Sequence, residues 1–174
     1  MTAHEQESIL RRWLDEHLGL MLKVVRGCAA SPPDQEDLFQ EVCLALWSSL
    51  PAFRGEARET TWIYRVAFNT ALAWQRGERR RRVGHETFLK FEVSPQVHPS
   101  HADALPEQEI VAQLYAAIRQ LPPVDASLAL MHLDGLSYQE MVEVLGISEN
   151  YIGVKLNRLR KQLAEQWQGV AHEL

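Results

Sequence analysis

The stretch LSYQEMVEVLGISENYIGVKLNRLRKQL, residues 136–163, decides the fold of the second half of the chain. Ser137 and Glu140 have the spacing of a capping box, in which the Ser side chain binds a helix N–H and the Glu reaches back. Gly146 stands where a left-handed residue ends a helix, and Ser148 can cap the next one. Two helices joined by so tight a turn predict a helix-turn-helix unit, whose second helix enters a DNA major groove.

The second helix of this unit has one apolar face and one polar face. Ile152, Leu156, Leu159 and Leu163 recur at helical spacing and predict its buried stripe. The residues expected to face duplex DNA are Ser148, Asn150, Tyr151, Lys155 and Arg158. The alternative is a helical hairpin with a solvated basic face, and this segment alone leaves that alternative open.

Helical periodicity continues outward over nearly the whole chain. It predicts one or two helices over residues 4–28, and single helices at about 37–50, 60–80, 107–121, 124–134, 137–145 and 149–167. Thr60 or Thr61 is expected to cap the helix at 60–80. Residues 84–106 mix Pro, His, Ser and Asp and predict a linker, with a short strand around Phe88, Phe91 and Val93 as an alternative. The predicted fold is therefore all-α, with two small helical domains, residues 1–83 and 107–174, joined by a flexible linker.

Composition places the chain among folded proteins. Of its 174 residues, 46% are hydrophobic and 24% are charged. The sequence has no apolar run of the ~20 residues that a membrane span requires, and its first residues do not resemble a secretory signal. We therefore expect a cytoplasmic protein, in which Cys28 and Cys43 are reduced thiols.

The net charge of −5 hides an alternation along the chain. Residues 51–90 and 151–174 carry net charges of +5 and +2, whereas residues 1–50 and 91–150 carry −4 and −8. Because charge asymmetry indicates partners better than the total does, the two basic blocks predict two contacts with phosphate. The acidic blocks are candidates for contact with a basic protein.

The basic block in the first half combines aromatic side chains with arginines. Residues expected to face a nucleic acid there are Phe53, Arg54, Trp62, Arg65, Asn69 and Arg76, followed by the run Arg79–Arg82. Bases stack on aromatic rings and arginine neutralises phosphate, so the pattern suits a single strand. Phe53, Trp62 and Tyr64 flank the loop 54–60, where an extruded base could lodge. The alternatives are core packing for Trp62 and a basic tail for the arginine run.

The acidic stretch DQEDLFQEVCLALW, residues 34–47, places Asp37, Gln40 and Glu41 on a helix surface backed by Leu38. This acidic patch, beside exposed apolar residues such as Phe39, is a candidate docking site for a basic partner. A solvated acidic face is the simpler alternative.

These segments together resemble the extracytoplasmic-function (ECF) sigma factors of bacterial RNA polymerase. The resemblance rests on DQEDLFQEVCLALW, then Phe53-Arg54-Gly55, then TTWIYRVAFNTALAWQR, then LPPVDASLALMHLDGLSYQEMVEVLGISENYIGVKLNRLRKQL, in the family's order and spacing. Gln35 and Val142 stand where the family usually has alanine, and the recognition helix ENYIGVKLNRLRK departs from the common pattern. That departure leaves the preferred promoter open.

The resemblance implies a role for each segment. Residues 1–83 would bind the polymerase clamp through Asp37, Leu38, Gln40 and Glu41 and would melt the minus-ten element with the aromatic and arginine side chains. Residues 107–174 would read the minus-thirty-five element, and the linker 84–106 would run toward the active cleft of the polymerase. The implied partners are core RNA polymerase, promoter DNA as duplex and melted strand, and an anti-sigma factor. The implied function is an alternative sigma factor that directs promoter-specific initiation.

Two other classes of protein compete with this interpretation. A dimeric helix-turn-helix repressor or activator would leave the acidic stretch and the tryptophan-arginine helix unexplained. An enzyme would need a nucleophile–base pair, a metal cluster or a phosphate loop, and the sequence has none of these. His98 and His101 are the nearest to a metal pair, and a solvated loop explains them better. We therefore expect no catalytic residues, no metal and no cofactor.

Overall fold

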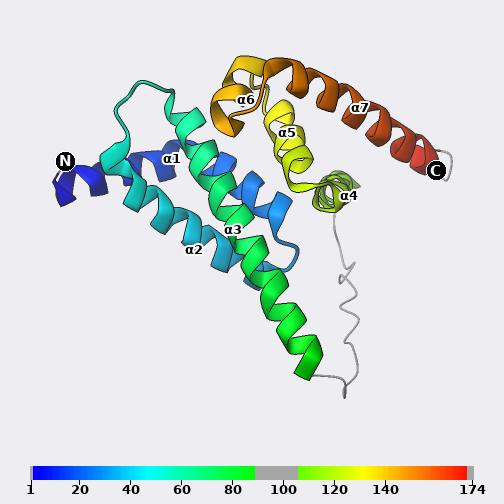
Figure 1. Ribbon diagram of the computed structural model, residues 1–174, viewed down its shortest axis with the longest axis horizontal. Coiled ribbons are helices and arrows are strands. Elements are labelled where there is room, and N and C mark those ends of the chain that lie inside the picture. Colours follow the sequence, from blue (N-terminus) through cyan, green and yellow to red (C-terminus); the bar gives the residue numbers. More distant parts are fainter. Residues whose placement is uncertain (1, 89–105, 172–174) are drawn as a thin grey trace.

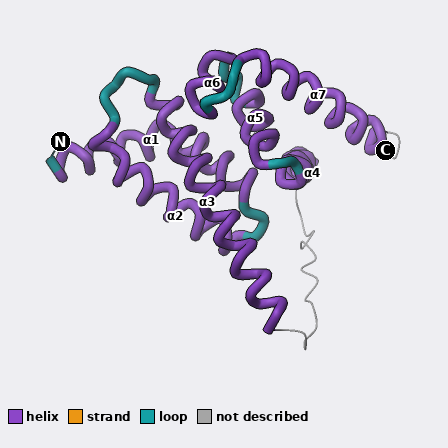
Figure 2. The backbone as a smooth tube through the Cα atoms, in the orientation of Figure 1, coloured by secondary structure: helices purple, strands orange, loops and turns teal. Residues whose placement is uncertain are grey.

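The computed structural model describes the backbone of residues 2–88 and 106–171 and the side chains of residues 2–77 and 109–162. Every regular element in this part of the chain is a helix (Figure 2). The elements are α1 (Ala3–Cys28), α2 (Pro32–Ser49), the 3-10 turn η1 (Leu50–Ala52), α3 (Glu59–Phe88), α4 (Pro106–Gln120), α5 (Pro123–Leu133), α6 (Tyr138–Leu145) and α7 (Glu149–Ala171). The predicted all-α fold with two helical groups is confirmed.

Helices α1, α2 and α3 form the N-terminal domain, each packed against the other two (Figure 1). Local signals begin the first two helices. Thr2 and Glu5 make a capping box at α1, and Ser31 accepts a hydrogen bond from the N–H of Asp34 at 3.2 Å ahead of α2. Trp13 and Leu38 are among the fully buried side chains between the helices. Burial of a large apolar side chain contributes about 1.5–3 kcal/mol, so this core holds the domain together.

Helix α3 begins one residue earlier than predicted, and the predicted caps Thr60 and Thr61 are wrong. Glu59 opens the helix, and its carboxylate accepts from both Nη groups of Arg12 in α1, at 2.9 and 2.5 Å. Thr61 lies in the core, where its hydroxyl is buried. The helix continues to Phe88, so the predicted strand does not include that residue. Phe91 and Val93 lie outside the described residues, as does most of the predicted linker.

Helices α4 to α7 form the C-terminal domain, in which α5 and α6 both pack on α7. The predicted capping box is present: Ser137 Oγ accepts from the N–H of Glu140 at 3.2 Å, and Glu140 accepts from the N–H of Ser137 at 2.8 Å. Gly146 ends α6 with φ of 68°, which a residue without a side chain adopts at little cost. Ser148 Oγ then accepts from the N–H of Tyr151 at 3.3 Å. The predicted helix-turn-helix is confirmed.

The two domains contact each other directly. Helix α1 packs against α4 and α5, and α3 packs against α6 (Figure 1). Gly27 of α1 lies against Leu130 of α5, where an added Cβ would be 2.6 Å from Cδ1 of Leu130 and would require that side chain to shift. The aliphatic packing at this point brings the turn after α5 onto the surface of α1 and α3.

Candidate nucleic-acid and protein interfaces

The acidic face of α2 is exposed as predicted. Asp37, Gln40 and Glu41 all point to solvent, whereas Leu38 is fully buried and holds α2 against the core. Leu38 is thus unsuited to a direct docking contact, which corrects the sequence prediction. Leu44, which the sequence analysis missed, continues the exposed line one turn further and is 62% exposed. Its spacing of three residues from Glu41 could have revealed it. We name Asp37, Gln40, Glu41 and Leu44 the acidic stripe.

Three aromatic rings lie in a row where α1, η1 and α3 meet. The Phe53 ring centroid lies 5.2 Å from that of Trp13, edge to face, and 5.4 Å from that of Trp62. Trp62 donates its indole N–H to Ser49 Oγ at 3.2 Å. Trp13 is fully buried, whereas Phe53 and Trp62 keep part of their surface exposed. Such pairs stabilise by ~0.5–1.5 kcal/mol beyond their buried area, so the two outer rings form a firm platform.

A pocket of about 420 Å³ opens beside this platform. Its lining includes Phe53, Arg54, Trp62 and Arg65 from the N-terminal domain and Glu143 from α6. Arg54 is exposed, but the guanidinium of Arg65 donates to the carbonyl oxygen of Glu143 from Nε at 3.1 Å and from Nη2 at 2.5 Å. The predicted single-strand residues therefore do come together, and α6 of the C-terminal domain covers part of them. We name this the loop pocket.

The remaining candidates of the basic block lie further along α3. Asn69 and Arg76 are both exposed, one and three turns beyond Arg65. The side chains of Arg79–Arg82 lie outside the described residues. The described part of α3 thus offers polar groups along one line leading away from the loop pocket, as a strand of nucleic acid would require.

Tyr64 lies near Arg58 and Thr60 at the end of the loop 54–60, but it does not line the loop pocket. It is buried, and its hydroxyl donates to the carboxylate of Asp134, in the turn after α5. Burial, with the hydrogen bond to Asp134 second, raises the pKa of Tyr64 far above its ordinary value of 10.0. Lys23 of α1 donates to the same carboxylate. Asp134 therefore joins the C-terminal domain to two helices of the N-terminal one.

A second ion pair joins the domains nearer the loop pocket. Arg58 Nη1 lies 2.8 Å from Glu140 Oε1, and Glu140 also belongs to the capping box of α6. Arg58 is largely exposed, so the pair contributes little by itself, about 0–1 kcal/mol. The contact between the domains thus depends mostly on the apolar packing and on the buried side of Asp134.

The recognition helix α7 presents most of the predicted DNA-facing residues to solvent. Asn150, Tyr151 and Arg158 are exposed, and Ser148 is the helix cap. Lys155 departs from the prediction because its Nζ lies 2.9 and 3.1 Å from the two carboxylate oxygens of Asp125 in α5. In the free chain its ammonium group is therefore already paired with Asp125, and the side chain is 24% exposed.

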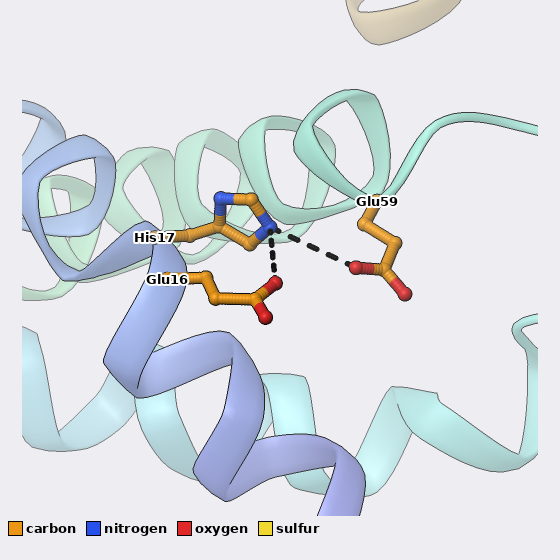
Figure 3. Close-up of side chains that lie close together, drawn as sticks. All are labelled: Glu16, His17 and Glu59. Carbon is orange, nitrogen blue, oxygen red and sulfur yellow. Dashed lines mark ion pairs between the residues drawn. The ribbon is translucent and has the colours of Figure 1, made fainter.

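One group of side chains in the described residues has the donor set for a cation. Glu16, His17 and Glu59 lie together at the junction of α1 and α3, with His17 Nε2 at 4.0 and 3.7 Å from the two carboxylates (Figure 3). Arg12 already neutralises both carboxylates, at 3.3 Å from Glu16 and 2.5 Å from Glu59. The cluster is thus an internal ion-pair network. His98 and His101 lie outside the described residues.

Two small helical domains, one with an aromatic–arginine pocket and the other with a helix-turn-helix, define a two-domain nucleic-acid-binding protein. The family model for Sigma-70 region 2 matches residues 13–81, and that for Sigma-70 region 4 matches residues 112–163. The chain belongs to the sigma-70 family, and within it is an alternative sigma factor of the ECF group.

Named relatives agree with this assignment. The chain is 25% identical over 167 residues to the ECF RNA polymerase sigma-E factor of Haemophilus influenzae, covering 92% of this chain and 86% of the relative. It is 26% identical over 163 residues to the RNA polymerase sigma-H factor of Pseudomonas aeruginosa, covering 90% and 82%.

Solved structures share the fold. The sigma factor RpoE of Bartonella quintana, in complex with the anti-sigma factor NepR, aligns with a TM-score of 0.68 at 20% identity, covering 91% of this chain and 96% of that one. CnrH, in complex with the cytosolic domain of CnrY, aligns with a TM-score of 0.65 at 18% identity, covering 94% and 90%. Among the helices that the structure describes, none is long and apolar enough to cross a membrane.

Proposed function

We propose that this sigma factor binds core RNA polymerase in the cytoplasm, reads two promoter elements with its two domains, and leaves the chemistry to the polymerase. One observation carries the proposal: an aromatic–arginine pocket and an exposed recognition helix lie in separate domains of one chain. The first suits an unstacked base and the second a duplex groove. A simple repressor would use only the second.

The N-terminal domain, residues 1–83 in the sequence prediction, takes the minus-ten element in this proposal. The acidic stripe docks on a basic surface of the polymerase, because its carboxylates are exposed and Leu44 adds an apolar anchor. Phe53 and Trp62 stack a flipped base, and Arg54 neutralises phosphate. Asn69 and Arg76 extend the same path along α3.

Arg65 reaches this DNA only after its bond to the Glu143 carbonyl is released. Binding to polymerase supplies that release if it holds the two domains apart, each over its own promoter element. The C-terminal domain, within residues 107–174, then places α7 in the major groove of the minus-thirty-five element. Residues 89–105, between α3 and α4, connect the two.

An anti-sigma protein is a further expected partner. The solved sigma factor RpoE is bound to the anti-sigma factor NepR. An inhibitor of this chain would compete with polymerase if it covered the acidic stripe or kept the domains together.

The test is to mix the purified chain with core polymerase, separate the complex by gel filtration, and carry out run-off transcription on genomic fragments. We expect a one-to-one complex that starts transcripts at defined sites. Asp37→Arg should weaken core binding at least tenfold, whereas Asp15→Arg, the same charge reversal on an exposed position of α1, should not. A folded chain that ignores core polymerase and binds palindromic DNA as a homodimer would overturn the proposal.

A further inference from the structure

The free face of α7 differs from the one that the sequence predicts. Ile152, Leu156 and Leu159 are buried, and Lys155 is turned aside to Asp125, whose side chain is 13% exposed. Four exposed residues of the first half of the helix, Asn150, Tyr151, Val154 and Asn157, are uncharged, and Tyr151 and Val154 are both 46% exposed. The exposed charged residues of this half, Glu149, Arg158 and Arg160, lie at the two ends of that group.

A shallow depression of about 580 Å³ lies on this face. Asn150, Val154 and Asn157 line it from α7, at spacings of four and three residues that put them in one row. Tyr138 of α6 forms one wall. Gly153 also lines it, and a Cβ there would make an ordinary van der Waals contact with the Tyr138 ring, at 3.6 Å.

The chemistry of the depression suits base edges better than phosphates. Glu149 and Val154 both line it, and neither a carboxylate nor an isopropyl group binds a phosphate. The cations Arg158 and Lys161 lie further along the helix, where they can reach the DNA backbone. In the major groove, asparagine pairs with adenine N6 and N7, and an apolar side chain contacts the C5 methyl of thymine.

Resting on the proposed role of the C-terminal domain, we propose that Val154 is a specificity-determining residue that reads a thymine methyl in the minus-thirty-five element, with Asn150 and Asn157 reading adenines beside it. The spacing fits. Val154 lies about 6 Å along the axis from Asn150 and about 4.5 Å from Asn157, against about 3.4 Å between base pairs. The three side chains thus meet neighbouring base pairs, and Lys155 positions the helix against α5 and does not read a base.

The experiment uses the holoenzyme formed with core polymerase. Preferred minus-thirty-five sequences are selected from a randomised promoter library, and each thymine of the selected element is then replaced singly by deoxyuridine, which removes only the C5 methyl. Wild-type holoenzyme should lose about fourfold in affinity at one position, the effect of one buried methyl group. Val154→Ala should bind the thymine and deoxyuridine promoters equally at that position.

Matched variants distinguish a thymine contact by Val154 from a general effect of the substitution on DNA binding. Val124→Ala changes another exposed valine of the same domain, 39% exposed, and should keep the fourfold difference. Asn157→Ala should lose the preference for adenine next to the sensitive thymine. Circular dichroism checks that each variant is folded.

Three results would overturn the inference. If the library yields an enriched element but no deoxyuridine replacement weakens wild-type binding, the thymine contact is refuted and the role of the domain stands. An unchanged fourfold loss in Val154→Ala has the same meaning. A library in which no minus-thirty-five sequence is enriched, although the holoenzyme forms, refutes the proposed role of the C-terminal domain as well.

Discussion

Replacing Asp134 by alanine should open the contact between the two domains. The change leaves the hydroxyl of the buried Tyr64 without its acceptor and removes the ion pair to Lys23. An unsatisfied buried donor costs about 1–3 kcal/mol. The Lys23 pair adds less than about 1 kcal/mol, because that lysine is 47% exposed. We take about 2 kcal/mol in all, which shifts the balance between closed and open forms about 30-fold.

The assay is the affinity of the free chain for a labelled single strand from the minus-ten region of a mapped promoter, measured by fluorescence anisotropy. Because α6 covers Arg65 in the closed form, the apparent affinity is lowered by the fraction of open chain. Asp134→Ala should therefore bind the strand more tightly, by up to about 30-fold, and should have a larger radius of gyration in small-angle scattering.

Asp134→Asn is the matched control, because its amide oxygen can still accept from Tyr64 while the charge opposite Lys23 is lost. It should raise the affinity only about threefold, in keeping with an exposed ion pair. If Asp134→Ala remains folded and binds the single strand no more tightly than wild type, the domain contact does not limit access to the loop pocket and the reasoning fails.

Three further outcomes test the local physics. Ser137→Ala should lower the free energy of unfolding of the C-terminal domain by about 1 kcal/mol, measured by urea titration, because it removes the acceptor for the Glu140 N–H. An unchanged urea midpoint would show that this cap does not stabilise the domain. The hydrogen bond from Arg12 lowers the pKa of the Glu59 carboxyl below 4.5, so its ionisation stabilises the fold above pH 4.5 and this contribution is lost as the pH falls through the lowered pKa. Glu59→Gln should therefore make the free energy of unfolding fall less steeply at acid pH. An equally steep fall in the variant would contradict this. Burial raises the pKa of the Cys28 thiol to about 12. Iodoacetamide at pH 8 should therefore alkylate Cys28 only after unfolding, which mass spectrometry would detect. Rapid labelling of the folded protein would count against the burial of Cys28.

The sequence predicted the parts of the fold that local signals determine. Ser137, Glu140 and Gly146 lie within ten residues of one another, and their side-chain chemistry specifies a cap and a stop whatever surrounds them. The long apolar periodicities likewise located the helices. The start of α3 escaped prediction because Glu59 is fixed by Arg12, a residue 47 positions away, which the local sequence cannot show.

The sequence identified most residues of the candidate sites, but it could not show which of their side chains are exposed together on one surface. Periodicity put Leu38 behind the acidic residues, and the packing of α2 shows that it is fully buried and cannot make the direct polymerase contact that the family resemblance implied. Lys155 is a residue type that often contacts DNA, but it forms an ion pair with Asp125 on another helix. Arg65 is covered by α6 because of the way in which the two domains pack together. The periodicity of a single sequence gives no information on that packing.

The contact between α3 and α6 joins parts of one chain, and this changes what a competitor must do. Because one chain carries both surfaces, their effective concentration is about millimolar, whatever the abundance of the protein. A partner present at about 1 μM must therefore bind the exposed surface about a thousandfold more tightly than α6 does to displace it. Diluting the protein does not loosen the contact, whereas cutting the chain between the domains would.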